Sequence, residues 1–71
     1  MSDEIQAEMA ANVWKVVVGE GDPVDEGDTL VILESMKMEI PVEATSSGTV
    51  SQIAVAEGSS VQEGDLIAVI D

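Results

Sequence analysis

The residues that could do chemistry are concentrated in one short stretch, Glu34–Glu39, with the sequence Glu-Ser-Met-Lys-Met-Glu. Lys37 is one of two lysines in the chain, and a lysine amine is a nucleophile that a partner enzyme can modify. Apolar, strand-like runs flank it at Thr29–Leu33 and Ile40–Val42, with no Gly, Asn or Pro between them. This arrangement predicts a tight hairpin with Met36 and Lys37 at its tip.

The acidic residues beside the lysine offer a second chemistry. Glu34 and Glu39 could in principle act as an acid–base pair, but two solvated carboxylates flanking a turn are the simpler interpretation. Most exposed lysines are themselves only solvated charge. The rest of the chain must therefore decide what Lys37 does.

Composition excludes most catalytic sites. The 71 residues contain no histidine and no cysteine, which removes Ser-His-Asp and Cys-His catalysis, disulfides and thiolate metal sites. An enzyme that works alone is not expected, and residues 1–71 are expected to form one domain. Fifteen acidic residues against two lysines give a net charge of −13. Such a surface repels nucleic acid and anionic membranes and favours partners with basic clefts.

The N-terminal segment carries no targeting pattern. It has no basic region followed by an apolar one, and no stretch approaches ~18 consecutive apolar residues. We therefore expect a soluble, cytoplasmic monomer with no metal site. Residues 1–4 are polar and terminal, so we expect them to be frayed.

Turn clusters recur every ~8–12 residues, which is typical of an all-β sandwich or barrel. No segment has a convincing helical pattern. The strands expected from apolar runs are Ile5–Met9, Asn12–Val18, Thr29–Glu34, Met38–Glu43, Thr49–Val55 and Leu66–Ile70.

An internal repeat organises these strands. Residues 11–34 align without gaps on residues 48–71, at an offset of 37, and share the element E-G-x-x-V-x-E-G-D. The repeat predicts two similar β-motifs related by a pseudo-two-fold axis. The equivalent of Lys37 would fall just outside the chain at either end, so the hairpin tip and the termini are expected at opposite poles.

Each residue type in the repeated element has a mechanical reason. Glycine accepts turns with positive φ at no steric cost. Val24 and Val61, between paired turns, are expected to enter the core while their neighbours stay in solvent. Asp28 and Asp65 are expected to accept backbone N–H bonds within their turns.

The spacing of the valines is irregular in both halves. Val13 lies three residues before Val16, so the two cannot share a face of a regular strand, and the second repeat has the same defect. A β-bulge would resolve it and leave Trp14 at least partly outside. The expected core is Val13, Val16, Val18, Val24, Leu30, Ile32, Ile40, Val42, Val50, Ile53, Val55, Val61, Ile67 and Val69.

The acidic residues do not form a recognisable metal loop. An EF-hand starting at Asp22 would place Gly27 correctly, but Val24 and Leu33 occupy two ligand positions and no helices flank the segment.

The sequence E-G-D-P-V-D-E-G-D-T-L-V-I-L-E-S-M-K-M-E, residues 20–39, resembles the biotinyl domain of biotin-dependent carboxylases, the biotin carboxyl carrier family. The resemblance covers about residues 5–71 and centres on Met-Lys-Met followed by Glu. Ser35 stands where the family usually has alanine, and the thumb loop of some bacterial carriers is missing. The chain resembles the short, free-standing biotinylated proteins most.

The resemblance implies a flattened all-β barrel-sandwich of two antiparallel sheets. It also implies that Lys37 takes biotin in amide linkage and that Met36, Met38, Glu34 and Glu39 are recognised by a biotin protein ligase. The expected function is a non-catalytic carrier of carboxyl groups between a biotin carboxylase and a carboxyltransferase.

Two other interpretations remain open. The first is a lipoyl carrier domain, which looks similar in fold but usually has Asp-Lys-Ala at the tip. The second is a biotinylated protein that serves as a biotin store or ligase target without a carboxylase.

Overall fold

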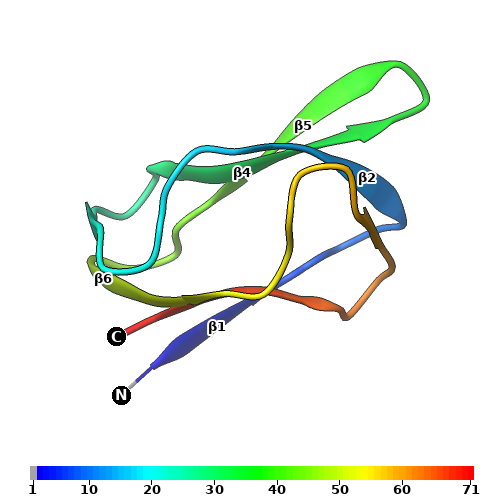
Figure 1. Ribbon diagram of the computed structural model, residues 1–71. Coiled ribbons are helices and arrows are strands. Elements are labelled where there is room, and N and C mark those ends of the chain that lie inside the picture. Colours follow the sequence, from blue (N-terminus) through cyan, green and yellow to red (C-terminus); the bar gives the residue numbers. More distant parts are fainter. Residues whose placement is uncertain (1) are drawn as a thin grey trace.

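The computed structural model describes residues 2–71 as two antiparallel β-sheets, with no helix among them (Figure 1). The strands are β1 (Asp3–Gln6), β2 (Ala11–Val16), β3 (Pro23–Val24), β4 (Thr29–Ser35), β5 (Met38–Glu43), β6 (Gly48–Ile53), β7 (Ser60–Val61) and β8 (Leu66–Ile70). The predicted all-β class with two sheets is confirmed. No helix in the described part of the chain is long and apolar enough to cross a membrane.

Each sheet has four strands, in the orders β1-β8-β6-β3 and β5-β4-β2-β7. The sequence did not predict β3 and β7, because each contains a single buried residue between two turns. Edge strands invite pairing with other chains. Here β3 and β7 are too short for it, and Pro41 in edge strand β5 has no N–H to offer.

The backbone hydrogen bonds follow the 37-residue repeat. Gly58 N donates to Val13 O at 2.8 Å, and the equivalent Gly21 N donates to Val50 O at 2.7 Å. We call the two repeated segments, residues 11–34 and 48–71, the frame. Each half of the frame therefore closes one of its turns on a strand of the other half, which is the pseudo-two-fold relation predicted from the repeat.

The hairpin of β4 and β5 extends from one end of the molecule (Figure 1). β1 begins and β8 ends at the other end, so the predicted opposite poles are confirmed. The molecule is elongated, with principal extents of 33 × 18 × 17 Å. The tip therefore protrudes from the frame instead of lying on its side.

The frame turns use glycine where the backbone requires it. Gly21, Gly27, Gly58 and Gly64 have φ between 89° and 92°. Each is the third residue of a turn closed by an i to i+3 hydrogen bond, the position that type II turns reserve for glycine.

The predicted aspartate bonds are present as well. Asp25 N donates to Asp28 Oδ2 and Gln62 N donates to Asp65 Oδ2, both at 2.9 Å.

The first glutamate of the repeated element has a role that the sequence did not reveal. Val16 N donates to Glu57 Oε2 at 3.1 Å, and the equivalent Ile53 N donates to Glu20 Oε2 at 3.1 Å. Each carboxylate thus satisfies a backbone donor at the end of the bulged strand of the other half.

The β-bulge predicted in each repeat is confirmed. The β2–β4 register shifts between Val13 and Lys15, and the β6–β8 register shifts between Val50 and Gln52. Trp14 occupies the bulge and is 48% exposed, as expected.

A second bulge corrects the predicted core. The β4–β5 register shifts between Thr29 and Val31, so Leu30 and Val31 are both buried. The inward positions of β4 are then Val31 and Leu33, and Ile32 is only half-buried. The same shift occurs at the equivalent point of β8, opposite β1.

The buried core is Ile5, Ala7, Val13, Val24, Leu30, Val31, Leu33, Ala44, Val50, Val61, Ile67, Ala68 and Ile70. Six of the expected core residues are buried, including Val24 and Val61. Another six pack against the core but are partly buried: Val16, Val18, Ile40, Val42, Ile53 and Val55. The prediction is wrong for Ile32 and Val69, which the second bulge turns away from the interior.

The N-terminal segment forms a strand earlier than expected. Asp3 and Glu4 lie in β1 and pair with Ile70 and Val69 of β8, which corrects the expectation of a frayed end for these residues. Of the other two residues, Ser2 is exposed and belongs to no strand, and Met1 lies outside the described residues.

Candidate functional site

The site is built on the hairpin between β4 and β5. Ser35 pairs with Met38, and the two residues between them, Met36 and Lys37, have φ of 52° and 66°. A two-residue loop with both φ values positive is a type I′ turn, whose twist matches that of the flanking strands. The tight hairpin predicted from the sequence is confirmed, with the same two residues at its tip.

The residue types at this tip are unfavourable for the turn they form. Type I′ turns strongly prefer Asn-Gly or Asp-Gly, and an L-residue in the left-handed region costs about 1–2 kcal/mol. Glu34 and Glu39 are also direct cross-strand partners, and like charges in that position are destabilising. Such local conflicts persist where the residues serve a function other than stability.

The side chains around the turn are presented to solvent. Met36 is 91% exposed and Met38 is 63% exposed, and Lys37 between them is exposed. The alternation along the hairpin required at least one exposed methionine, and the structure exposes both. Leu33, which pairs with Ile40, is the last fully buried residue of β4 before the tip. Its side chain therefore anchors the hairpin to the core below Lys37.

The second lysine is placed differently. Lys15 lies within β2, opposite Ile32 of β4, and is exposed on the outer face of the sheet. The ladder with β4 holds the backbone of Lys15 within the sheet, whereas a protruding turn can enter the active site of another enzyme. The Lys37 amine therefore lies at a protruding tip, whereas the Lys15 amine lies on the side of a sheet.

The described residues offer no catalytic group to accompany Lys37. No cluster of three or more acidic side chains within residues 2–71 could hold a metal ion. The segment considered as an EF-hand runs through β3 and into β4 rather than forming a loop. What the site can do chemically is present one primary amine on a rigid support.

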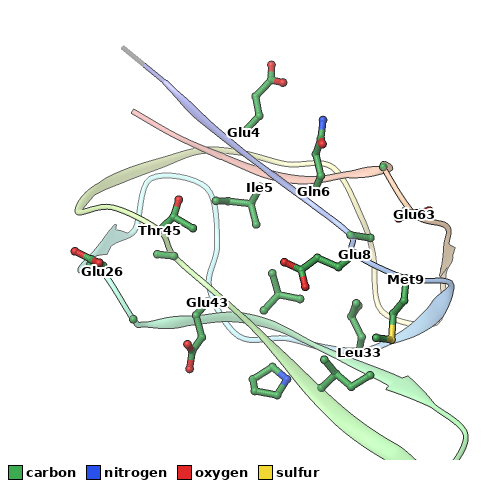
Figure 2. A pocket seen from close by; sticks show the side chains of 17 residues that line it. Glu4, Ile5, Gln6, Glu8, Met9, Glu26, Leu33, Glu43, Thr45 and Glu63 are labelled. Carbon is green, nitrogen blue, oxygen red and sulfur yellow. The ribbon is translucent and has the colours of Figure 1, made fainter.

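A groove lies between the edge strands β1 and β5, away from the tip (Figure 2). The apolar side chains of Ile5 and Leu33 lie inside it, and the carboxylates of Glu26 and Glu43 lie at its margin (Figure 2). Its lining includes pairs related by the repeat, such as Ala7 with Ala44 and Gly27 with Gly64. The groove thus follows from the pseudo-two-fold arrangement, and Lys37 does not line it.

A shallow hollow beside the tip was not foreseen. Asn12, Met36 and Ser60 are among its lining residues, and Ser60 Oγ donates to Asn12 Oδ1 at 3.1 Å. β7 brings Ser60 to this place by pairing with β2. No pattern in the sequence announces a two-residue strand, so nothing could have placed these residues near Lys37.

Comparison with known protein families identifies the family of this chain. The family model described as "Biotin-requiring enzyme" matches residues 1–70. The chain belongs to this biotin/lipoyl attachment family. The resemblance stated from the Met-Lys-Met motif is confirmed, and the biotin-requiring family model together with the biotinylated relatives confirms biotin as the predicted cofactor. The biotinyl domain is a carrier and not a catalytic unit.

Individual relatives are consistent with the family. The "Biotinylated protein TB7.3 homolog" of Mycolicibacterium smegmatis is 64% identical over 44 residues, which span 62% of this chain and 62% of that protein. The crystal structure of Kluyveromyces lactis urea carboxylase matches with a TM-score of 0.94 and 41% identity, over all of this chain and 6% of that one. A single-chain, multi-domain long-chain acyl-CoA carboxylase matches with a TM-score of 0.89 and 32% identity, over 96% of this chain and 7% of that one.

Proposed function

We propose that Lys37 is the residue that carries biotin and that the chain acts as a biotin carboxyl carrier. The observation that supports this most is the position of Lys37 at the exposed tip of a two-residue turn, within Met-Lys-Met, in a chain of the biotin-requiring family. The amine fits the group, because nothing in the described frame encloses it. Bound there, biotin supplies a ureido nitrogen that accepts and releases a carboxyl group.

The attachment requires a separate enzyme. Forming an amide from a lysine side chain releases a proton from its nitrogen, which a base must accept. The chain has no histidine or cysteine to take the proton. A biotin protein ligase must therefore deprotonate the amine. The ligase first converts biotin and ATP to biotinyl-adenylate and pyrophosphate. Lys37 Nζ then attacks the carboxyl carbon of the adenylate, so that the amide bond forms, the bond between the carboxyl carbon and the phosphate oxygen breaks, and AMP leaves.

We propose that the ligase recognises the residues around the lysine. Met36 and Met38 offer flexible apolar contacts without being needed in the core. Glu34 and Glu39 place two carboxylates in one cross-strand row directly below the tip. The strain and the like-charge pair at this turn are then explained by recognition.

The proposed carrier role is supported by the protruding tip on a folded frame (Figure 1). A tethered group reaches two active sites in turn at a high effective concentration, without any catalytic group of the carrier. We propose a biotin carboxylase and a carboxyltransferase as the partners, since the matching segments of the two solved structures lie in carboxylases. The net charge of −13 favours basic clefts and opposes self-association, so we expect a monomer.

The experiment that tests this function begins with the biotinylated protein. It is used to recover partners from the cytosol of its own organism, and the purified enzymes are assayed for transfer of label from bicarbonate to the protein. We expect a carboxylase to be recovered and to load label onto the biotinylated chain only.

Recovery of no carboxylase, together with no labelling by purified carboxylase, would contradict the carrier role and favour a biotin store or ligase target. A lipoyl adduct on the isolated protein would favour the lipoyl carrier instead.

A further inference from the structure

The outer face of the sheet that bears the hairpin is unusually apolar for an exposed surface. Lys15, Ile32 and Pro41 lie side by side in register across β2, β4 and β5. Trp14 emerges from the bulge next to them, and Val17, just beyond β2, is 50% exposed. We call these five residues, Trp14, Lys15, Val17, Ile32 and Pro41, the hairpin face.

The internal repeat supplies a control for this surface within the same molecule. The corresponding positions on the other sheet are Ser51, Gln52, Ala54, Val69 and Glu4. They occupy the equivalent bulge and the equivalent cross-strand row of the other sheet, since Gln52 pairs with Val69 and Val69 pairs with Glu4. The equivalent bulge of the frame is therefore built with a serine, so a bulge of this kind does not by itself require a tryptophan.

The hairpin face is continuous with the tip. The next exposed cross-strand row toward the turn is Asn12, Glu34 and Glu39. The pair Ser35–Met38 then leads into the turn at Met36 and Lys37. An apolar centre containing the chain's only tryptophan thus meets two carboxylates and then the reactive amine. Tryptophan is among the residues most enriched at the centres of interfaces.

Two considerations indicate which partner covers this face. They are the area that a contact must bury and the part of the carrier that each enzyme must approach. Even a transient contact buries about 500 Å² on each partner, roughly a ninth of the 4368 Å² that this chain exposes. A two-residue turn cannot present that area. Enzymes that act on biotin reach the end of a long arm, whereas the ligase must bring Lys37 Nζ itself into its active site and so must contact the protein beside the tip.

We infer that the hairpin face is the docking surface for the biotin protein ligase. This rests on the proposed modification of Lys37. The matching surface of the ligase is apolar opposite Trp14 and Ile32, basic opposite Glu34 and Glu39, and acidic opposite Lys15. The polar face of the other sheet is left free.

The test exchanges the two faces one residue at a time. Trp14→Ser gives the hairpin face the residue of its counterpart, and Ser51→Trp is the matched control. Biotinylation by purified ligase is followed with ATP and biotin in excess, over a range of carrier concentrations. We expect Trp14→Ser to lower kcat/KM about tenfold or more, mainly through KM, and Ser51→Trp to stay within about twofold of the parent.

A second pair of variants keeps the test valid if Trp14→Ser folds poorly. Circular dichroism at the assay temperature will show whether it does. Lys15→Glu reverses an exposed charge of the hairpin face, and Gln52→Glu introduces the same charge on the other face. We expect only Lys15→Glu to raise KM, by about threefold or more, and the effect to shrink with added salt.

The outcomes separate the two proposals. If neither the parent nor any variant is biotinylated on Lys37, the proposed function fails. If the parent is biotinylated but the folded hairpin-face variants match it, or if both faces respond alike, the docking surface is wrong. A loss that appears only in later carboxylation, with normal biotinylation, also overturns the ligase as the occupant.

Discussion

The glycine turns of the frame and the tip of the hairpin meet the same backbone demand with opposite residues. At the four frame turns the positive φ of 89–92° falls on glycine. At the tip, φ values of 52° and 66° fall on Met36 and Lys37. Because an L-residue in this region costs about 1–2 kcal/mol, the frame is built for stability and the tip is not.

The same division follows the internal repeat. The glycine turns, the bulges and the carboxylates of Glu20 and Glu57 all occur twice, at an offset of 37 residues. The tip has no counterpart among the described residues. Duplicated features therefore mark what the fold needs, and features without a counterpart mark where to look for function.

The largest effect on stability is expected where the two halves of the frame differ. A Cβ at Gly48 would overlap the carbonyl oxygen of Asp71 and lie 2.9 Å from Ile70 Cγ2. Its counterpart, Ala11, already carries a Cβ. We expect Gly48→Ala to lower the free energy of unfolding by about 3 kcal/mol or more, because backbone must move. Ala11→Gly, the matched control, should lower the free energy of unfolding by only about 0.5–1 kcal/mol. Chemical denaturation measures both changes.

A smaller loss is expected at a frame turn. A Cβ at Gly64 would meet nothing within 4 Å, so any cost of Gly64→Ala comes from its φ of 89° alone. We expect a loss of about 1–3 kcal/mol in the free energy of unfolding. An unchanged denaturation midpoint would show that the frame turns do not need glycine.

The opposite sign is expected at the tip. Met36→Asn places at the first turn position a residue that tolerates positive φ, and should raise the free energy of unfolding by about 1 kcal/mol. The same variant should be biotinylated more slowly, since it loses the exposed methionine. A variant that is both destabilised and normally modified would contradict the distinction between frame and tip.

The smallest effect concerns the like-charged pair below the turn. Glu39→Lys converts the cross-strand contact with Glu34 into an attractive one, worth about 0.2–1 kcal/mol relative to a neutral pair. We expect a slightly higher melting temperature at low salt and a smaller gain at high salt. A gain that does not depend on salt would mean that the charges are not its cause.

Local chemistry in the sequence was sufficient for much of this structure. Glycines, aspartates and the misplaced spacing of Val13 and Val16 predicted the turns, their hydrogen bonds and one bulge, because each signal lies within a few residues. The second bulge was missed since the run from Leu30 to Leu33 is apolar throughout, and such a run does not show which residues face inward.

For the site, too, the sequence predicted the local features and missed the long-range contacts. Lys37 and the two methionines follow from the motif and the flanking strands, because a two-residue hairpin is a local structure. Asn12 and Ser60, which meet beside the tip, come together only through β7, a pairing of residues 48 positions apart. Contacts of that kind depend on the tertiary arrangement of the frame and have no local signal.

The central claim is that the chain gives up stability at one turn in order to present Lys37 for modification. Its most direct test is mass spectrometry of the protein after incubation with ligase, biotin and ATP, for the parent, Lys37→Arg and Lys15→Arg. The account predicts one biotinyl group on the parent and on Lys15→Arg, and none on Lys37→Arg. A Lys37→Arg protein that still accepts biotin would contradict it.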